Sequence, residues 1–175
     1  VEGNNLIHGS DFNDLSKWSL GRWAIDTTVK CEGITSVKLD VNQTDSSSFY
    51  LTNNKNFDTS EGEAFVGSCY IRTPNKDAIK GNGAWVEFTI TKADGTTTYS
   101  YQYFKPTSNN VWERIVYSAK MPVGATKFNV DFGFNGSAAV MYIAKPMLSR
   151  GTIASVWKLH TDELISDGAI TTDKI

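Results

Sequence analysis

The stretch that decides the fold is residues 85–104, which read WVEFTITKADGTTTYSYQYF. Apolar and polar residues alternate on both sides of Lys92-Ala93-Asp94-Gly95. This period of two is typical of a β-strand with one buried face, because successive side chains point to opposite faces of the strand. An Asp-Gly pair between two such segments predicts a β-hairpin. We therefore expect residues 85–91 and 96–104 to pair as antiparallel strands.

The register of this hairpin depends on the length of its loop, since a slip of one residue moves every side chain to the other face. A loop of even length gathers the apolar and tyrosine positions on the core side: Val86, Phe88, Ile90, Tyr99, Tyr101 and Tyr103. An odd loop instead sets Ser100 and Gln102 opposite Phe88 and Val86, and burying such groups without partners costs about 1–3 kcal/mol each. We therefore predict the even loop. The non-core face then carries Trp85, Glu87, Thr89, Thr91, Thr98, Ser100, Gln102 and Phe104.

The same period of two recurs along most of the chain. Alternating segments lie at residues 36–41, 48–52, 65–72, 112–121, 127–134 and 140–143. A polar stretch, residues 42–47, is expected to form a loop between the first two. About eight to ten short strands at this spacing are typical of a β-sandwich. We therefore predict an all-β fold of two antiparallel sheets.

The pattern changes after Pro146. Residues 153–165 are expected to form a short helix or an extended arm, with Trp157 packing back on the domain. A chain of 175 residues suits one domain, which we assign to residues 1–160, followed by a linker at residues 161–175. The chain begins Val1-Glu2-Gly3, without Met or an apolar signal segment, so we expect it to be part of a larger protein.

Composition and charge exclude several classes of function. The net charge is −2, so the chain lacks the basic footprint of a nucleic-acid-binding protein. Lysines and arginines are scattered singly, which gives no support to electrostatic membrane binding. No apolar run approaches the ~20 residues that a membrane-spanning helix needs. We therefore expect neither a nucleic-acid partner nor membrane insertion.

Few side chains are arranged for catalysis or metal binding. His8 and His160 stand alone in the sequence, without a zinc spacing or a nucleophile motif beside them. Cys69 lies on the apolar face of its predicted strand, where a small buried thiol is common. Whether it forms a disulfide with Cys31 stays open. We expect no enzyme activity and no metal ligands.

Short motifs follow one another at a characteristic spacing along the chain. They are Asn5-Leu6-Ile7, Asp11-Phe12, Trp18, residues 33–39 (GITSVKL), residues 68–72 (SCYIR), Trp112-Glu113-Arg114, Met121-Pro122 and residues 142–148 (YIAKPML). In this order they resemble the jelly-roll carbohydrate-binding modules of the galactose-binding-like superfamily, including modules of phage tail and baseplate receptor-binding proteins. The resemblance covers most of residues 5–160 and implies a jelly-roll β-sandwich with a short C-terminal arm or helix.

A second resemblance lies near the end of the chain. Residues 168–175 (GAITTDKI) look like one unit of the GAIT-x-DKI repeats of phage fibre and baseplate proteins. Residues 145–151 (KPMLSRG), with Ala154 and Trp157, look like the closing segment of phage-encoded modules. The resemblance implies a location in the virion, other tail or baseplate subunits as partners, and a saccharide of the host cell surface or cell wall as ligand. A secreted protein is the alternative.

The chain departs from the family pattern at one point. Many members hold a structural Ca²⁺ with an acidic pair on the last strand, where this chain has Ala144 and Lys145. A lysine there would repel the cation. We therefore expect no cofactor, although Asp11 and Asp131 are able to contribute to some other calcium site.

A saccharide site needs aromatic faces that stack on sugar C–H groups and planar polar side chains that bond the hydroxyls. The non-core face of the predicted hairpin offers Trp85, Glu87, Gln102 and Phe104. Adjacent strands are expected to extend it into a groove with Tyr70, Arg72, Asn129, Asp131 and Tyr142. Trp23 is a further candidate at the rim. The alternative is that Trp85 and Phe104 lie beneath a loop such as residues 75–82.

Residues and resemblance together favour a non-catalytic carbohydrate-binding module that attaches a phage tail or baseplate protein to host saccharide. One alternative is an ancillary module of a secreted glycoside hydrolase, and another is a structural jelly roll that docks other particle subunits. A small hydrolase is the third. Glu61 and Glu63 flank a turn, where acids are more often solvated than catalytic, and a carboxylate pair at a glycosidase spacing of about 5–9 Å is not visible in a sequence.

Overall fold

The structure is a computed structural model that describes residues 3–166, with the side chains of residues 3–164. Its strands are β1 (Trp18–Ser19), β2 (Ala24–Cys31), β3 (Ile34–Asn53), β4 (Phe57–Asp58), β5 (Ala64–Arg72), β6 (Lys80–Lys92), β7 (Thr97–Phe104), β8 (Glu113–Lys120) and β9 (Ala125–Arg150). The helical segments are η1 (Leu15–Lys17), η2 (Lys76–Ala78) and α1 (Thr161–Ser166). The predicted all-β fold is confirmed, whereas the tail motif at residues 168–175 lies outside the described residues.

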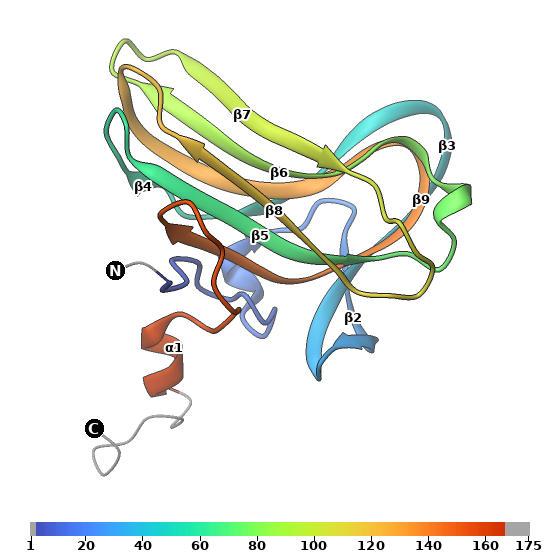
Figure 1. Ribbon diagram of the computed structural model, residues 1–175. Helices are drawn as coiled ribbons and strands as arrows, with labels where there is room; N and C mark the ends of the chain where they lie inside the picture. The colour runs from blue at the N-terminus through green and yellow to red at the C-terminus, as the bar shows by residue number, and fades with distance from the viewer. Residues whose placement is uncertain (1–2, 167–175) are drawn as a thin grey trace.

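Two long strands, β3 and β9, run through both layers of the sandwich (Figure 1). They pair antiparallel with each other, first over residues 47–52 with 131–136 and then over residues 37–42 with 138–143. In the first layer β9 also pairs with β6, which pairs with β7. In the second layer β3 pairs with β2, and β9 pairs with β5, which pairs with β8. The result is the two-sheet antiparallel sandwich.

The nine strands of the described residues agree with the predicted number, but two of them are much longer than predicted. Residues 36–41 and 48–52 belong to one strand, β3, and the segments at 127–134 and 140–143 both belong to β9. The predicted loop at residues 42–47 is wrong, because these exposed residues stay extended while the pairing with β9 shifts register. At this point the strand bends from one layer into the other, and its polar side chains remain in water. They therefore do not interrupt the strand.

The core lies between the layers and is rich in phenylalanine. Alternate residues of β9 point into it, and Phe128, Phe132 and Phe134 are fully buried. The Phe128 ring lies 4.6 Å from Phe65 of the second layer and 5.6 Å from Phe88 of the first. Each such side chain contributes about 1.5–3 kcal/mol by leaving water. These contacts hold the two sheets face to face.

The hairpin of β6 and β7 forms, but the predicted register is wrong. Trp85 pairs with Tyr103 and Glu87 pairs with Tyr101, so the tyrosines share the face of Trp85. The last ladder pair precedes a turn in which Lys92 N–H donates to the Thr96 carbonyl at 2.8 Å. Gly95 stands within the turn at φ +85°, a left-handed position that glycine adopts without strain. This is the odd, three-residue loop with a bulge.

The odd loop leaves neither Ser100 nor Gln102 buried without a partner, because β7 is an edge strand of its layer. Gln102 stays exposed there and so remains in contact with water. Ser100, half-buried, forms a hydrogen bond with the hydroxyl of Tyr117 from β8. Neither polar group is therefore buried without a partner, and the cost that excluded this register does not arise.

The segment after β9 folds back on the second layer. Trp157 Nε1 donates to the Pro146 carbonyl at 3.2 Å, which confirms the predicted packing of that side chain. Arg114 Nη2 donates to the Ser155 carbonyl at 2.6 Å. Helix α1 then contacts the N-terminal segment, where Glu163 Oε2 accepts from Gly9 N–H at 2.9 Å. Among the described residues, no helix has both the length and the apolar character needed to cross a membrane.

The absence of a side chain at Gly133 of β9 lets Trp85 and the backbone of Phe49 pack closely against this residue. A Cβ at this position would lie 2.3 Å from Trp85 Cζ2 and 2.4 Å from the Phe49 carbonyl oxygen. We predict that Gly133→Ala lowers the free energy of unfolding by about 3 kcal/mol, since a backbone atom cannot give way. Urea unfolding measures the change.

Gly62→Ala is the matched control. Gly62 has φ +83° and open space around it, so that variant should lose only about 1 kcal/mol from backbone strain. Equal losses in the two variants would contradict the packing described for Gly133.

Candidate functional site

Aromatic side chains gather on the outward face of the first layer. The register brings Tyr50 of β3 opposite Gly133 of β9, Gly133 opposite Trp85 of β6, and Trp85 opposite Tyr103 of β7. Tyr101 and Tyr99 continue the row of tyrosines along the edge strand. We call Tyr50, Tyr99, Tyr101 and Tyr103 the tyrosine cluster; their exposed fractions run from 37% to 58%. Four rings are thus available on one face.

Trp85 lies buried beneath this cluster. Only 4% of it is exposed, because its ring lies directly over Gly133 and between two tyrosines. The ring centroid of Tyr50 is 5.0 Å away at 70°, and that of Tyr103 is 6.4 Å away at 83°. Both are edge-to-face contacts, a favourable geometry for aromatic pairs. The predicted exposure of Trp85 is therefore wrong, and its neighbours carry the accessible rings.

Two carboxyl groups lie beside Trp85. Glu87 of β6 and Asp131 of β9 are direct cross-strand neighbours, and both are buried. Asp131 accepts from Trp85 Nε1 at 2.7 Å and from Thr89 Oγ1 at 3.0 Å. Each of the two carboxyl groups also influences the pKa of the other. We call these two residues the carboxyl pair.

The carboxyl pair holds a proton at neutral pH. Burial, followed by the adjacent Glu87 carboxylate, raises the pKa of Asp131 to about 8. Burial also raises the pKa of Glu87. Two carboxylates in contact cannot both ionise readily, since like charges disfavour the charged form. The pair therefore presents one hydrogen-bond donor and several acceptors.

One oxygen of the carboxyl pair has no partner. Glu87 Oε1 is buried and forms no hydrogen bond with the described residues. An unsatisfied buried acceptor costs about 1–3 kcal/mol. Tyr50 and Tyr103 lie nearby: burial and then the Glu87 carboxylate raise the pKa of the Tyr50 hydroxyl, and burial, Tyr101 and Glu87 do so for Tyr103. Both hydroxyls thus stay protonated.

The structure brings together only part of the predicted site. Trp85, Glu87, Asp131 and Asn129 do share one outward face, with Asn129 opposite Thr89. Gln102 and Phe104 have the opposite parity, because the hairpin register differs, and Phe104 packs partly buried against the core. Both assignments are wrong.

The prediction that Trp23 lies at an accessible rim is also wrong. It is 3% exposed, and its Nε1 donates to the Phe49 carbonyl at 3.0 Å. Burial of the ring against the end of the sandwich leaves no face free for a ligand.

Tyr70, Arg72 and Tyr142 lie on the second layer and cannot extend the groove. Arg72 and Lys38 flank Tyr142 in the register, and Lys38 Nζ lies 5.6 Å from the Tyr142 ring. Arg114 and Lys145 lie 5.7 and 5.5 Å from the Tyr70 ring. These cation–aromatic contacts belong to the opposite outer face of the sandwich.

The tyrosine cluster itself was missed by the sequence analysis. Tyr99, Tyr101 and Tyr103 stand at alternate positions and were assigned to the core. The signal that identifies them is the Asp-Gly turn taken as a three-residue loop with a bulge, which reverses the parity of β7. Tyr50 alternates with the apolar Phe49 and Leu51, and this alternation is the local signal that it points outward.

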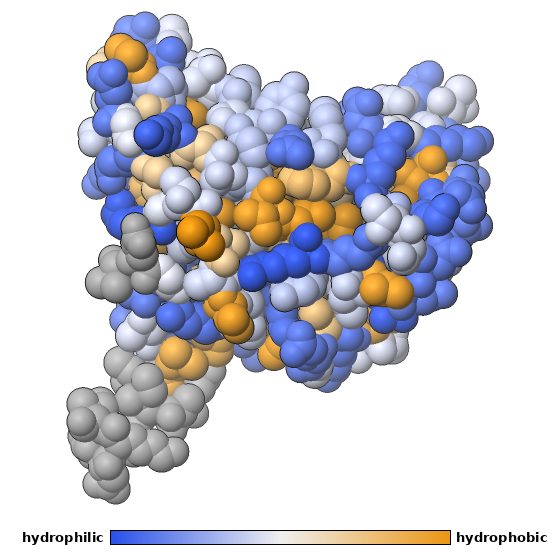
Figure 2. Space-filling view, viewed as in Figure 1, coloured by the Kyte–Doolittle hydropathy of each residue, from blue (hydrophilic) through white to orange (hydrophobic). Residues whose placement is uncertain are grey.

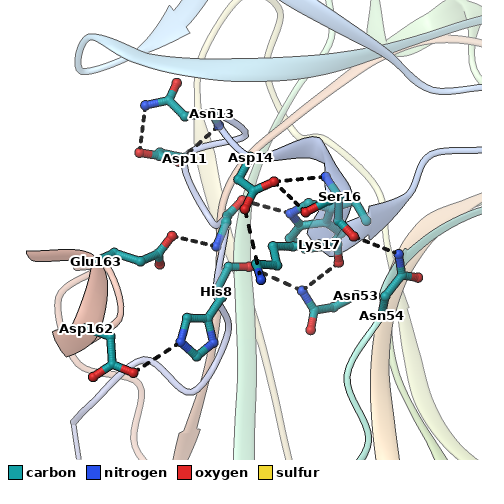
Figure 3. Close-up of polar contacts among 12 residues, drawn as sticks. His8, Asp11, Asn13, Asp14, Ser16, Lys17, Asn53, Asn54, Asp162 and Glu163 are labelled. Carbon is teal, nitrogen blue, oxygen red and sulfur yellow. Dashed lines mark hydrogen bonds and ion pairs between the residues drawn. The ribbon is translucent and has the colours of Figure 1, made fainter. Parts of the chain in front are cut away.

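A second polar cluster lies at the N-terminal end of the molecule (Figure 3). A cavity of about 370 Å³ is lined there by His8, Ser16, Lys17, Asn53, Asn54 and Lys55. The histidines that stand alone in the sequence meet at its edge, since the rings of His8 and His160 stack with centroids 3.7 Å apart. Burial, and then the neighbouring His8, lower the pKa of His160.

The two cysteines are not joined. Cys31 and Cys69 are both buried free thiols, and burial raises the pKa of each. The open question of a disulfide is thereby answered for this structure, and neither thiol has the exposure or low pKa of a reactive cysteine.

Solved structures with the same architecture include carbohydrate-binding modules. No protein-family profile and no curated protein sequence matches the chain. A family 16 carbohydrate-binding module superposes with a TM-score of 0.60 at 14% identity, covering 83% of this chain and 99% of that one. The two chains therefore share a fold over most of their lengths.

Two larger proteins contain the same fold. An arabinose-bound family 51 α-L-arabinofuranosidase gives a TM-score of 0.57 at 16% identity over 87% of this chain. The enzymatically active domain of bacteriophage CBA120 tailspike protein 4 gives 0.59 at 14% over 86%. This chain spans 27% of the first and 22% of the second. At such identities the likeness establishes the jelly-roll sandwich and nothing finer.

The carboxyl pair makes stability depend on pH. The pKa of Asp131 is about 8 in the fold against an ordinary value of 3.8, so the native state binds a proton that the unfolded chain releases. We predict that the free energy of unfolding falls as pH rises from about 4 to about 8 and then levels off. Unfolding in urea at a series of pH values measures this slope.

Asp131→Asn should flatten that slope, because the amide cannot ionise. Asp45→Asn, at an exposed acid outside the cluster, should keep the slope of the unmodified protein. A slope unchanged in Asp131→Asn would contradict the proton assigned to the carboxyl pair.

Proposed function

We propose that this protein is a non-catalytic carbohydrate-binding module whose site is the tyrosine cluster with the carboxyl pair at its base. The observation that carries the proposal is the buried Glu87 Oε1, which lacks a partner beside four exposed tyrosine rings. Sugars combine C–H faces, which stack on aromatic rings, with hydroxyls that donate and accept hydrogen bonds. If a tyrosine side chain rotates away, a sugar hydroxyl can reach Glu87 Oε1 and donate a hydrogen bond to this acceptor.

The neutral surroundings of the carboxyl pair favour a hydroxyl ligand. Asp131 accepts from Trp85 and Thr89, which carry no charge. A retained proton lets the pair both donate and accept, as a sugar hydroxyl does. An anionic ligand would instead need a cationic partner at this point.

The geometry of the carboxyl pair does not match a hydrolase. The acids of a glycosidase stand about 5–9 Å apart, on either side of the scissile bond. Glu87 and Asp131 are direct cross-strand neighbours on one face of the sheet, and both are buried. They stand side by side on adjacent strands and do not flank an open space for a scissile bond, so we assign the pair to binding.

We further propose that the module attaches a phage tail or baseplate protein to saccharide of the host cell surface, and that it resides in the virion. The tailspike domain with the same fold supports this context, as does the resemblance of residues 168–175 to fibre repeats. Weak sites presented in several copies gain avidity of ~10²–10⁴. The arabinofuranosidase supports the alternative, an ancillary module of a secreted glycoside hydrolase.

A structural docking role is the second candidate, and an apolar surface favours it. Figure 2 shows apolar side chains in a strip across the middle of the face seen in Figure 1, where β8 crosses the molecule. Val116 of β8 and, after β9, Ile153 and Val156 are exposed. Such a surface suits another subunit of a particle. The residues of this apolar surface are different from those of the tyrosine cluster, so substitutions test the docking role and the saccharide-binding role separately.

Replacement of single tyrosines tests the site. We predict that Tyr50→Ala and Tyr101→Ala each weaken saccharide binding by about tenfold, which corresponds to one lost stacking contact. A glycan array with the unmodified protein identifies the ligand, and calorimetry with that ligand measures the variants. Glu87→Gln should also weaken binding, because the amide nitrogen replaces an acceptor.

Tyr70→Ala, which removes a tyrosine from the opposite face, is the matched control and should bind as the unmodified protein does. Circular dichroism confirms that each variant is folded. Unchanged binding by Tyr50→Ala and Tyr101→Ala would refute this site, and release of sugars from bacterial cell wall would refute the non-catalytic assignment. Failure to bind any glycan or host cell would favour the docking role.

A further inference from the structure

Three metal-ligating side chains meet where the two ends of the described chain touch. His8 lies in the N-terminal segment, His160 lies just before α1, and Asp162 lies in its first turn. Within residues 3–164 these three are the one group of histidine, cysteine or acidic side chains whose donor atoms could hold a single ion. Figure 3 shows Asp162 reaching from α1 toward the ring of His8.

The donor atoms converge on one small region. Asp162 Oδ2 lies 3.6 Å from His8 Nε2 and 3.7 Å from His160 Nδ1. One atom from each residue lies within 4.8 Å of the others. Zinc bonds of about 2.0–2.2 Å at tetrahedral angles place neighbouring donors about 3.3–3.6 Å apart. The two carboxylate distances therefore need to change by only a few tenths of an ångström.

The donor types select the class of metal. Two imidazoles with one carboxylate suit Zn²⁺ and other borderline divalent metals, which bind nitrogen well. Calcium and magnesium prefer oxygen ligands in larger number. Three protein donors leave a fourth position, and the Asp162 side chain is 75% exposed, so water can reach it.

The surroundings hold the donors in place. Glu163, next to Asp162, accepts from Gly9 N–H, next to His8. The Asp162 N–H donates to His160 Nδ1 at 3.0 Å. That contact keeps this nitrogen free of a proton, and a metal bound there would replace it. The imidazoles stack at an angle of 24°, so one ring must turn for both nitrogens to face a shared ion.

We propose that His8, His160 and Asp162 form a binding site for Zn²⁺ or a similar divalent transition metal, which ties the N-terminal segment to α1. The site is separate from the saccharide face and does not depend on it. Lys17 and Lys55 line the adjoining cavity, and their positive charge opposes the ion. Removing that charge should therefore tighten binding.

Titration of the full chain, free of any histidine tag, with Zn²⁺ tests the site. Calorimetry should show one ion per chain, and Zn²⁺ should raise the unfolding temperature, as a ligand that binds only the folded state does. Calcium and magnesium should leave that temperature unchanged. Co²⁺ should give visible absorption typical of tetrahedral nitrogen and oxygen ligands, and the ring signals of both histidines should shift in NMR spectra.

Substitutions assign the ligands. His8→Ala and His160→Ala should each weaken Zn²⁺ binding at least a hundredfold, and Asp162→Asn about tenfold or more. Lys55→Ala should strengthen it severalfold, because it removes a positive charge from the cavity beside the site. Glu61→Gln, at an exposed acid elsewhere, is the matched control and should match the unmodified protein.

Two outcomes overturn the proposal: absence of Zn²⁺ binding by the unmodified protein at millimolar concentration, or unchanged binding by the folded His8→Ala and His160→Ala variants. If His8→Ala fails to fold, the other two variants test the site, because His160→Ala should weaken Zn²⁺ binding and Lys55→Ala should strengthen it. Saccharide binding by all these variants should equal that of the unmodified protein, so failure of the metal site and failure of the saccharide site are distinguished.

Discussion

Strands β3 and β9 pair antiparallel through both layers of the sandwich, and the outward and inward positions of the molecule depend on the register of that pairing. With the observed register, Phe49 and Leu51 point into the core while Tyr50 points outward across from Gly133. A slip of one residue would exchange these sets. The burial of large apolar side chains, worth about 1.5–3 kcal/mol each, excludes that slip. The surface that carries the candidate site is thus set by the core beneath it.

Trp85 connects this scaffold to the site. Its ring fills the space over Gly133, its Nε1 holds Asp131, and its edges contact Tyr50 and Tyr103. Burial raises the pKa of both acids of the carboxyl pair, because it disfavours the charged form, whereas the hydrogen bond from Trp85 by itself lowers the pKa of Asp131. A side chain that resembles a stacking surface in the sequence therefore acts as a support. The accessible rings around it are tyrosines, whose hydroxyls add polar contacts.

The strands and part of the site lie where the sequence predicts them, and the misplaced residues all depend on contacts between distant strands. Trp85, Glu87 and Asp131 share an outward face as predicted, because alternation is a local property of each strand. Gln102 and Phe104 were misplaced because the polar side chains of the edge strand β7 stay in water or find a partner, which local sequence does not reveal. The choice between the even and the odd loop depends on Tyr117 of a distant strand, which forms a hydrogen bond with Ser100. Tyr70, Arg72, Tyr142 and Trp23 were misplaced for the same reason, since no local pattern tells which layer a strand joins or which end of the sandwich covers a ring.

Sequence by itself determined the all-β class, the alternation within each strand and the position of the main hairpin, because these follow from backbone geometry and from turn residues such as Asp94 and Gly95. Tertiary structure alone decided which strands became neighbours, which face of the hairpin met water, and that His8 would stack on His160 from the other end of the chain. The physical reason is that these outcomes depend on contacts between residues far apart in the sequence. Such contacts form only when the two long strands bend and bring both layers together.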